Sequence, residues 1–89
     1  MITITDNHRA VLSRRSETGK MGMPLHCDLL QPWVLVVMFE LSVAKLIECV
    51  SHRLPMDHPI YGRIFCDIYK LTDAGEKLCA DHDILAIKD

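Results

Sequence analysis

The stretch from Trp33 to Val50, WVLVVMFELSVAKLIECV, limits the possible folds of this chain more than any other segment. It is apolar enough to be mistaken for a membrane span, but Glu40, Lys45 and Glu48 interrupt it. A spanning helix needs about 20 predominantly apolar residues and rarely carries such charges. We therefore expect the segment to be buried in a protein core, and we expect no membrane association.

The spacing of the apolar residues changes within this stretch. Val34 to Phe39 is apolar throughout, so periodicity does not distinguish a strand from a buried helix there. Helical spacing of i, i+4, i+7, i+8 and i+11 then gives one apolar face, formed by Phe39, Val43, Leu46, Ile47 and Val50. These residues predict a helix that extends to about His52, either continuous or broken between Glu40 and Ser42.

Two shorter helices are expected before this stretch. Thr5 and the residues after it offer side chains that cap a helix N-terminus, and the apolar positions that follow predict a helix from about Asp6 to Ser16. The next segment, TGKMGMP, is expected to be a loop because of its glycines and proline. The leucines between Leu25 and Leu30 predict a second, short helix, and Pro32 suits the first position of the helix after it.

The second half of the chain predicts a β-hairpin. Arg63–Leu71, RIFCDIYKL, is rich in Ile, Phe and Tyr and alternates between two faces, which is typical of a strand. Its antiparallel partner is expected near Leu54–Met56 or Ile60–Tyr61, with Asp57–Gly62 available for the turn. The prolines of the segment PMDHP exclude it from the centre of a sheet.

This strand runs directly into a capped helix. The Thr72 hydroxyl can cap the helix, and Asp73 and Glu76 place carboxylates in its first turn, where the helix dipole favours negative charge. Gly75 lowers helix stability by about 1 kcal/mol relative to Ala, and we expect it there because the helix packs closely against the strand. Residues 81–89 predict a final short strand or a docking segment.

Size and charge narrow the class of protein. A chain of 89 residues, 49% of them hydrophobic, predicts one α+β domain spanning residues 1–89, with a stability of the order of 5–10 kcal/mol. Ten Lys or Arg residues oppose twelve Asp or Glu residues, so the formal net charge is −2 and no polyanionic partner is demanded. The basic excess is confined to residues 1–20.

The cysteines and histidines predict neither a metal site nor a catalytic site. Cys27, Cys49, Cys66 and Cys79 form no CxxC pair and follow no apolar signal segment, which predicts buried free thiols in a cytoplasmic protein. Structural zinc sites usually have paired ligands a few residues apart, so we expect no metal and no cofactor. The sequence has no P-loop, GxGxxG or HExxH motif, and we expect no catalytic residues.

The pattern Tyr-x-Leu-Thr-x-x-Gly-x-x-Leu, after helices and a turn that contains proline and glycine, resembles the end of a winged helix-turn-helix domain of the kind found in PadR-like and MarR-like regulators and in small phage or plasmid proteins. The matching residues are Tyr69, Leu71, Thr72, Gly75 and Leu78. The resemblance implies three to four helices with a two- or three-stranded β-wing. Arg63–Leu71 would be the second wing strand, and the helix that ends near His52 would occupy the place of the recognition helix.

The first functional hypothesis is therefore a transcriptional regulator that binds double-stranded DNA. The resemblance places Lys45, Ser51, His52 and Arg53 in the DNA groove, with Arg63, Arg14 and Arg15 on phosphates. The candidate helix also carries Glu48 and is otherwise mostly apolar. A duplex would therefore meet little positive potential there.

The second hypothesis uses the same fold to bind protein. Small acidic chains of this kind resemble phage and mobile-element proteins that disable host defence complexes such as CRISPR effectors. In such an anti-CRISPR-like inhibitor, an acidic surface would imitate phosphate through Asp57, Asp67, Asp73, Asp81 and Asp83. A homodimer would have to use Trp33–Phe39 or the C-terminal segment.

Overall fold

The long apolar stretch divides into a helix and a strand. In this computed structural model, which describes residues 2–86, helix α2 covers Pro32–Val43 and strand β2 covers Ile47–His58. The expected helix to His52 is therefore wrong in its second half. Ala44 ends the helix, and Lys45 follows with φ of 61°, in the left-handed region that turns the chain. Ile47 then pairs with Leu71 in the sheet, so tertiary strand pairing overrides the helical spacing.

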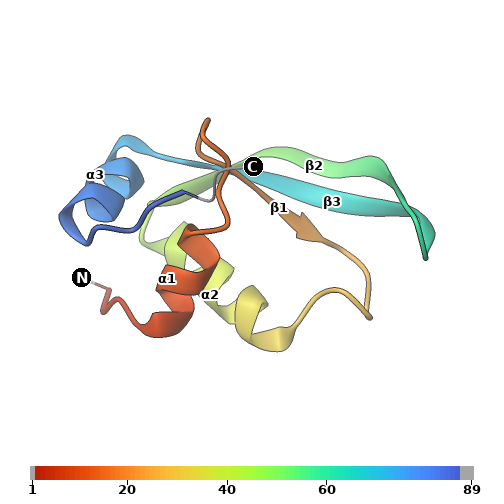
Figure 1. Cartoon of the computed structure of the whole chain (residues 1–89), viewed down its shortest axis with the longest axis horizontal. Coiled ribbons are helices and arrows are strands. Elements are labelled where there is room, and N and C mark those ends of the chain that lie inside the picture. The colour runs from red at the N-terminus through yellow and green to blue at the C-terminus, as the bar shows by residue number, and fades with distance from the viewer. Residues whose placement is uncertain (1, 87–89) are drawn as a thin grey trace.

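Three helices and a three-stranded antiparallel sheet make up the described residues. The elements follow the order α1 (Asp6–Leu12), β1 (Lys20–Pro24), α2, β2, β3 (Gly62–Leu71) and α3 (Asp73–Asp81). The strand order in the sheet is β1-β3-β2. Helices α1 and α2 lie together on one side of the sheet, and α3 lies at the end of the molecule opposite the turn of the β2–β3 hairpin (Figure 1).

The start of the chain was only partly foreseen. Helix α1 confirms a helix at Asp6, although it ends four residues earlier than expected, at Leu12. The expected loop at TGKMGMP is instead strand β1, and its signal was the alternation of Met21 and Met23, both buried, with exposed neighbours. The expected helix over Leu25–Leu30 is a turn, because this segment leaves the sheet next to β3.

The expected hairpin is confirmed with Leu54–Met56 as part of the partner strand, whereas the alternative partner Ile60–Tyr61 lies in the turn. Strands β2 and β3 pair from Ile47–Leu71 to His58–Gly62, and Gly62 has φ of 70° after the turn. Pro55 lies inside β2, which the strand order places at an edge of the sheet, the position where sheets tolerate proline. The register shifts twice, between Cys49 and Ser51 and again between Ser51 and Leu54. These irregularities twist the hairpin and change which side chains face the helices.

The expected junction of strand and capped helix is also confirmed. Thr72 is the N-cap residue of α3, and its Oγ accepts a hydrogen bond from the Gly75 N–H at 3.1 Å. The same hydroxyl donates to the Lys45 carbonyl at 2.7 Å. A Cβ atom on Gly75 would overlap the Leu46 carbonyl oxygen, so the glycine permits the close packing of α3 on the turn after α2.

The core lies between the sheet and helices α1 and α2. Its centre is formed by Leu12 of α1 and Leu41 of α2, which are fully buried. Met21, Met23, Ile47 and Leu71 cover it from the strands, and Cys79 and Ile84 close the end beneath α3. Ile84, which was expected in a strand or a docking segment, follows a turn without strand structure; residues 87–89 of that expectation lie outside the described residues.

Candidate functional site

The expected reading helix does not exist where the DNA hypothesis placed it. Ser51, His52 and Arg53 lie on the irregular part of β2, and Lys45 lies in the turn before that strand. A recognition helix presents its contact residues on one helical face, which these four residues do not share. The correction follows from the same strand pairing that ends α2 at Val43.

An acidic group lies among the expected bases of β2. The backbone N–H of Arg53 donates to Asp67 Oδ1 at 2.9 Å, and His52 Nδ1 lies 3.6 Å from the same oxygen. The Arg53 guanidinium lies over the Phe65 ring, 5.2 Å from its centre. Asp67 therefore offsets positive charge where the DNA hypothesis needs it and is not free to imitate a phosphate.

The expected phosphate contacts lie apart from one another. Arg15 donates to the carbonyl oxygens of Leu12 at 2.8 Å and Ile84 at 2.6 Å, so it fastens the C-terminal segment to α1. Arg14 lies over the Trp33 ring, 5.5 Å from its centre. Arg63 lies on the hairpin opposite Asp57. Figure 1 places the hairpin turn far from α1 along the long axis of the molecule, so these arginines form no common basic surface.

The five expected acidic residues are likewise dispersed. Asp73 and Asp81 are the first and last residues of α3, and Asp83 follows the helix with φ of 53°. Asp57 belongs to the hairpin, at the other end of the molecule from α3 (Figure 1). These carboxylates and Asp67 therefore do not lie together on one acidic surface.

Sequence reasoning missed an exposed apolar surface on α2. Four large side chains are exposed there by 47, 56, 69 and 65%, namely Leu35, Val36, Phe39 and Val43. At 3.6 residues per turn they fall within about 100° of the helix circumference, and we call them the α2 stripe. The opposite side of the helix is buried through Val37, Met38 and Leu41. The available signal was that α2 is apolar all round, because such a helix needs cover on every side.

The α2 stripe carries one ridge with a hollow on either side. Phe39 projects between the two hollows and lines both. One hollow, of about 270 Å³, lies between α2 and the sheet and is lined by Met23, Leu35, Met38, Phe39, Ser42 and Tyr69. Burial raises the pKa of the Tyr69 phenol, so this side chain stays neutral well above neutral pH. The other hollow, of about 450 Å³, is lined by Ile2, Phe39, Glu40, Val43 and Ala44.

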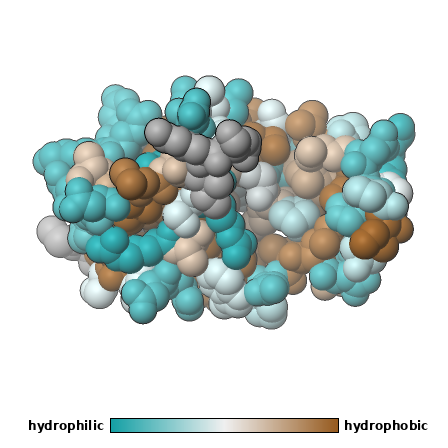
Figure 2. Space-filling view, in the orientation of Figure 1, coloured by the Kyte–Doolittle hydropathy of each residue, from teal (hydrophilic) through white to brown (hydrophobic). Residues whose placement is uncertain are grey.

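A second group of exposed apolar side chains lies on the β2–β3 hairpin. It comprises Leu54, Met56, Ile60, Tyr61 and Phe65. Figure 2 shows hydrophobic side chains gathered toward the hairpin half of the molecule on one face, whereas the α3 half of that face is mostly hydrophilic. The hairpin group is less continuous than the α2 stripe, because Arg53 covers part of Phe65.

The irregular part of β2 brings a cysteine, a histidine and a carboxylate together. Cys49 Sγ lies 3.6 Å from His52 Nδ1, and Asp67 Oδ1 lies 3.6 Å from the same nitrogen. A nucleophile–base–acid relay needs the two different ring nitrogens, one for the thiol and one for the carboxylate. Cys49 Sγ also contacts the Ser51 carbonyl at 3.4 Å. These three side chains therefore lack the geometry of a catalytic triad.

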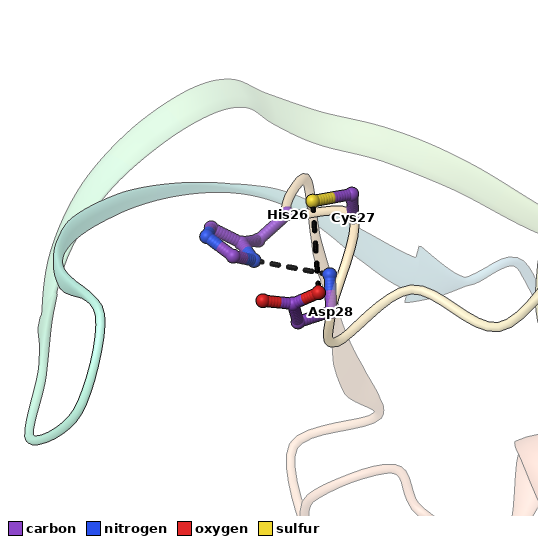
Figure 3. Close-up of side chains that lie close together, drawn as sticks. All are labelled: His26, Cys27 and Asp28. Atoms are coloured by element: carbon purple, nitrogen blue, oxygen red, sulfur yellow. Dashed lines mark hydrogen bonds between the residues drawn. The ribbon is translucent and has the colours of Figure 1, made fainter.

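Three potential metal ligands lie within 4.8 Å of one another at His26, Cys27 and Asp28 (Figure 3). Hydrogen bonds within the turn already use some of these atoms: His26 Nδ1 accepts from the Asp28 backbone N–H at 3.1 Å, and the Cys27 thiol contacts Asp28 Oδ1 at 3.8 Å. A closed tetrahedral zinc site needs four protein ligands. The trio is a hydrogen-bonded surface turn, and we assign no metal to it.

One buried polar side chain joins the first two helices. His8 is 3% exposed, and its Nδ1 accepts from the Thr5 N–H at 3.1 Å as part of a capping box. The other ring nitrogen, Nε2, lies 3.5 Å from Glu40 Oε2 without a hydrogen bond. The only charged side chain of α2 therefore lies beside α1 at the border of the α2 stripe, where it also lines the hollow next to Phe39 and Val43.

The four cysteines are unpaired, and their environments differ. Cys66 and Cys79 are buried as expected, and burial raises the pKa of each thiol. The expectation of burial is wrong for Cys27, which is exposed, and Cys49 is half-buried.

Comparison with known proteins gives no relationship: no family model matches the chain, and no curated protein or solved structure matches it significantly. Among residues 2–86, none of the helices has both the length and the apolar content that crossing a membrane requires.

Proposed function

We propose that this protein is a non-enzymatic protein-binding module that docks a partner protein on the α2 stripe. One observation carries the proposal: a helix whose only charged side chain is turned toward α1 exposes four large apolar residues in one continuous band. The largest exposed apolar patch of a monomeric protein is often functional, and such patches mark interaction sites. Aromatic residues, Phe included, are enriched in the cores of protein interfaces.

We further propose a winged-helix-like arrangement. The support is the β2–β3 hairpin as a wing, the strand order β1-β3-β2 and the helix α2 immediately before the wing. In that arrangement α2, rather than the segment ending at His52, takes the place of the recognition helix. Its sequence, PWVLVVMFELSV, offers no Arg, Lys, Asn or Gln to base edges. The helix position that regulators use to read DNA is therefore suited here to protein.

The decisive experiment compares two single variants with the wild-type protein. Phe39→Lys places a charge in the centre of the α2 stripe, and Ile60→Lys adds the same charge at the hairpin turn, where the side chain is 79% exposed. Partners captured from a cell lysate are identified by quantitative mass spectrometry. We expect a partner that is retained by Ile60→Lys and weakened at least tenfold by Phe39→Lys, the size of effect that a hot-spot residue gives.

The DNA hypothesis is tested on the same samples. Binding to a labelled random duplex is measured across a salt series, together with Lys45→Ala and Arg53→Ala. We expect no binding near physiological salt at tens of micromolar protein, a range where nonspecific DNA binding commonly appears. Strong binding that weakens steeply with salt and is lost in these two variants would replace the protein-binding proposal with a DNA-binding one.

A further inference from the structure

We infer that the partner on the α2 stripe is a second copy of this chain, packed antiparallel across a two-fold axis that passes beside Phe39. The inference rests on the proposed function, because it names the occupant of that surface. Three properties of the α2 stripe support it: its spacing along the helix, its charge and its shape.

Three of the four residues of the α2 stripe are spaced equally in both directions from Phe39, and the fourth, Val36, has Ser42 as its counterpart three residues after Phe39. Leu35 lies four residues before Phe39 and Val43 lies four residues after it, and all three are exposed. A two-fold axis pairs each residue of one helix with the residue equally far from the axis on the other. An axis beside Phe39 therefore places Leu35 of each copy against Val43 of its partner, with the phenylalanines adjacent at the centre.

The charge of the α2 stripe also permits self-association. No charged side chain lies among the four apolar residues, and the charge nearest the contact is Glu40, which lines the hollow beside Phe39 and Val43. Glu40, at the border of the α2 stripe, is directed to His8 of its own chain. In a two-fold dimer the same surface of each copy meets its own counterpart, so that surface must be complementary to itself. An uncharged apolar band meets this condition most simply.

The shape provides a ridge and hollows to receive it. Phe39 stands between the hollows of about 270 and about 450 Å³, and a second copy presents the same ridge. Helices pack by setting the ridges of one into the grooves of the other. Four large side chains exposed by 47–69% make a patch in the range of about 300–600 Å² that marks the largest patch of a typical monomer. This size is below the about 800 Å² per partner of a standard interface, so the dimer is weak, with a dissociation constant above the micromolar level.

The association is measured by sedimentation of the full chain across a concentration series from about 1 to 500 µM, which brackets the weak affinity expected for an interface at the small end of the size range. The mass should rise from 10.1 kDa toward twice that value in the wild-type protein and in Ile60→Lys. Phe39→Lys and, as a second variant, Val43→Lys should keep the monomer mass. Both substitute exposed side chains, and circular dichroism verifies that they fold.

The antiparallel two-fold is tested by disulfide cross-linking, with Cys27 and Cys49 replaced by Ser to remove the accessible thiols. Phe39 is kept in every sample. An equimolar mixture of Leu35→Cys and Val43→Cys chains should cross-link under mild oxidation, because the two positions face each other. Leu35→Cys alone should cross-link at least tenfold less. Equal cross-linking of both samples would overturn the antiparallel arrangement.

The results separate this inference from the proposed function. A wild-type protein that keeps the monomer mass up to 500 µM, or a Phe39→Lys variant that dimerises as well as the wild type, overturns the two-fold dimer. In either case, a lysate partner lost specifically in Phe39→Lys would leave the protein-binding function standing with a different occupant. Absence of both self-association and such a partner would overturn both proposals.

Discussion

Substitution of Gly75 by Ala should destabilise this protein, although the same change stabilises an ordinary helix. Gly75 lies in the first turn of α3, where Ala would raise helix stability by about 1 kcal/mol. Its backbone, however, lies against the chain that connects α2 and β2. The added Cβ would overlap the Leu46 carbonyl oxygen and approach Leu71 Cδ2 to 3.1 Å. A backbone carbonyl cannot rotate away as a flexible side chain can, so α3 must shift.

The structure sets the size of the effect. Overpacking of this kind costs about 1–3 kcal/mol. A shift of α3 also strains the hydrogen bond from the Thr72 N–H to the Leu46 carbonyl, 3.0 Å long, and a bond of this kind contributes about 0.5–1.5 kcal/mol. Together these losses exceed the gain in helix propensity. We expect the free energy of unfolding to fall by about 1–3 kcal/mol, which lowers the midpoint of thermal unfolding by about 4–8 °C per kcal/mol in a chain of this size.

Urea and thermal unfolding, followed by circular dichroism at one protein concentration, measure this loss. Gly22→Ala is the matched control, because a Cβ there meets Ile68 Cδ1 at 3.7 Å, an ordinary contact. The control should be neutral or should stabilise the protein by up to about 1 kcal/mol. A Gly75→Ala protein that is as stable as the wild type, or more stable, would refute the close packing of α3 on the turn after α2.

Two further predictions concern buried groups. His8→Ala should lower the free energy of unfolding by about 1–3 kcal/mol, because it removes part of the α1 capping box and leaves a cavity beside α2; exposed Asn7→Ala in the same turn should change it by less than about 0.5 kcal/mol. Stability should also fall as the pH rises above about 9, near the ordinary pKa of a thiol, since burial raises the pKa of Cys79 in the folded state and the unfolded chain loses that proton first. Cys79→Ala should reduce this alkaline slope, whereas exposed Cys27→Ala should leave it unchanged; identical slopes in both variants would contradict the assignment.

Several elements could be predicted because their causes are local. Thr72 followed by two acidic residues in the first turn of α3 is a signal contained in a few adjacent residues, and the helix begins there. The alternating faces of Arg63–Leu71 and the prolines of the preceding segment likewise identified the hairpin and kept β2 away from the centre of the sheet. The capping residue Thr5 marked the start of α1 in the same way.

The sequence could not decide where α2 ends. Leu46, Ile47 and Val50 have helical spacing with Phe39 and Val43, yet Leu46 lies in the turn after α2 and the other two lie in β2. The choice depends on Ile47 pairing with Leu71, a partner 24 residues away in the chain. In the structure Leu46 and Ile47 are buried whereas Val50 is exposed, and strand pairing, unlike a longer helix, also satisfies the backbone hydrogen bonds of β3.

The candidate site was decided by tertiary structure for the same reason. The sequence by itself determined a small α+β domain with a capped terminal helix, a hairpin and a core segment that starts at Pro32. Once α2 ended at Val43, Ser51, His52 and Arg53 moved to an edge strand beside Asp67. Whether an apolar residue is core or surface depends on how many neighbours surround its helix. One layer of α1 and sheet covers only part of the circumference of α2, and Phe39 is left facing outward.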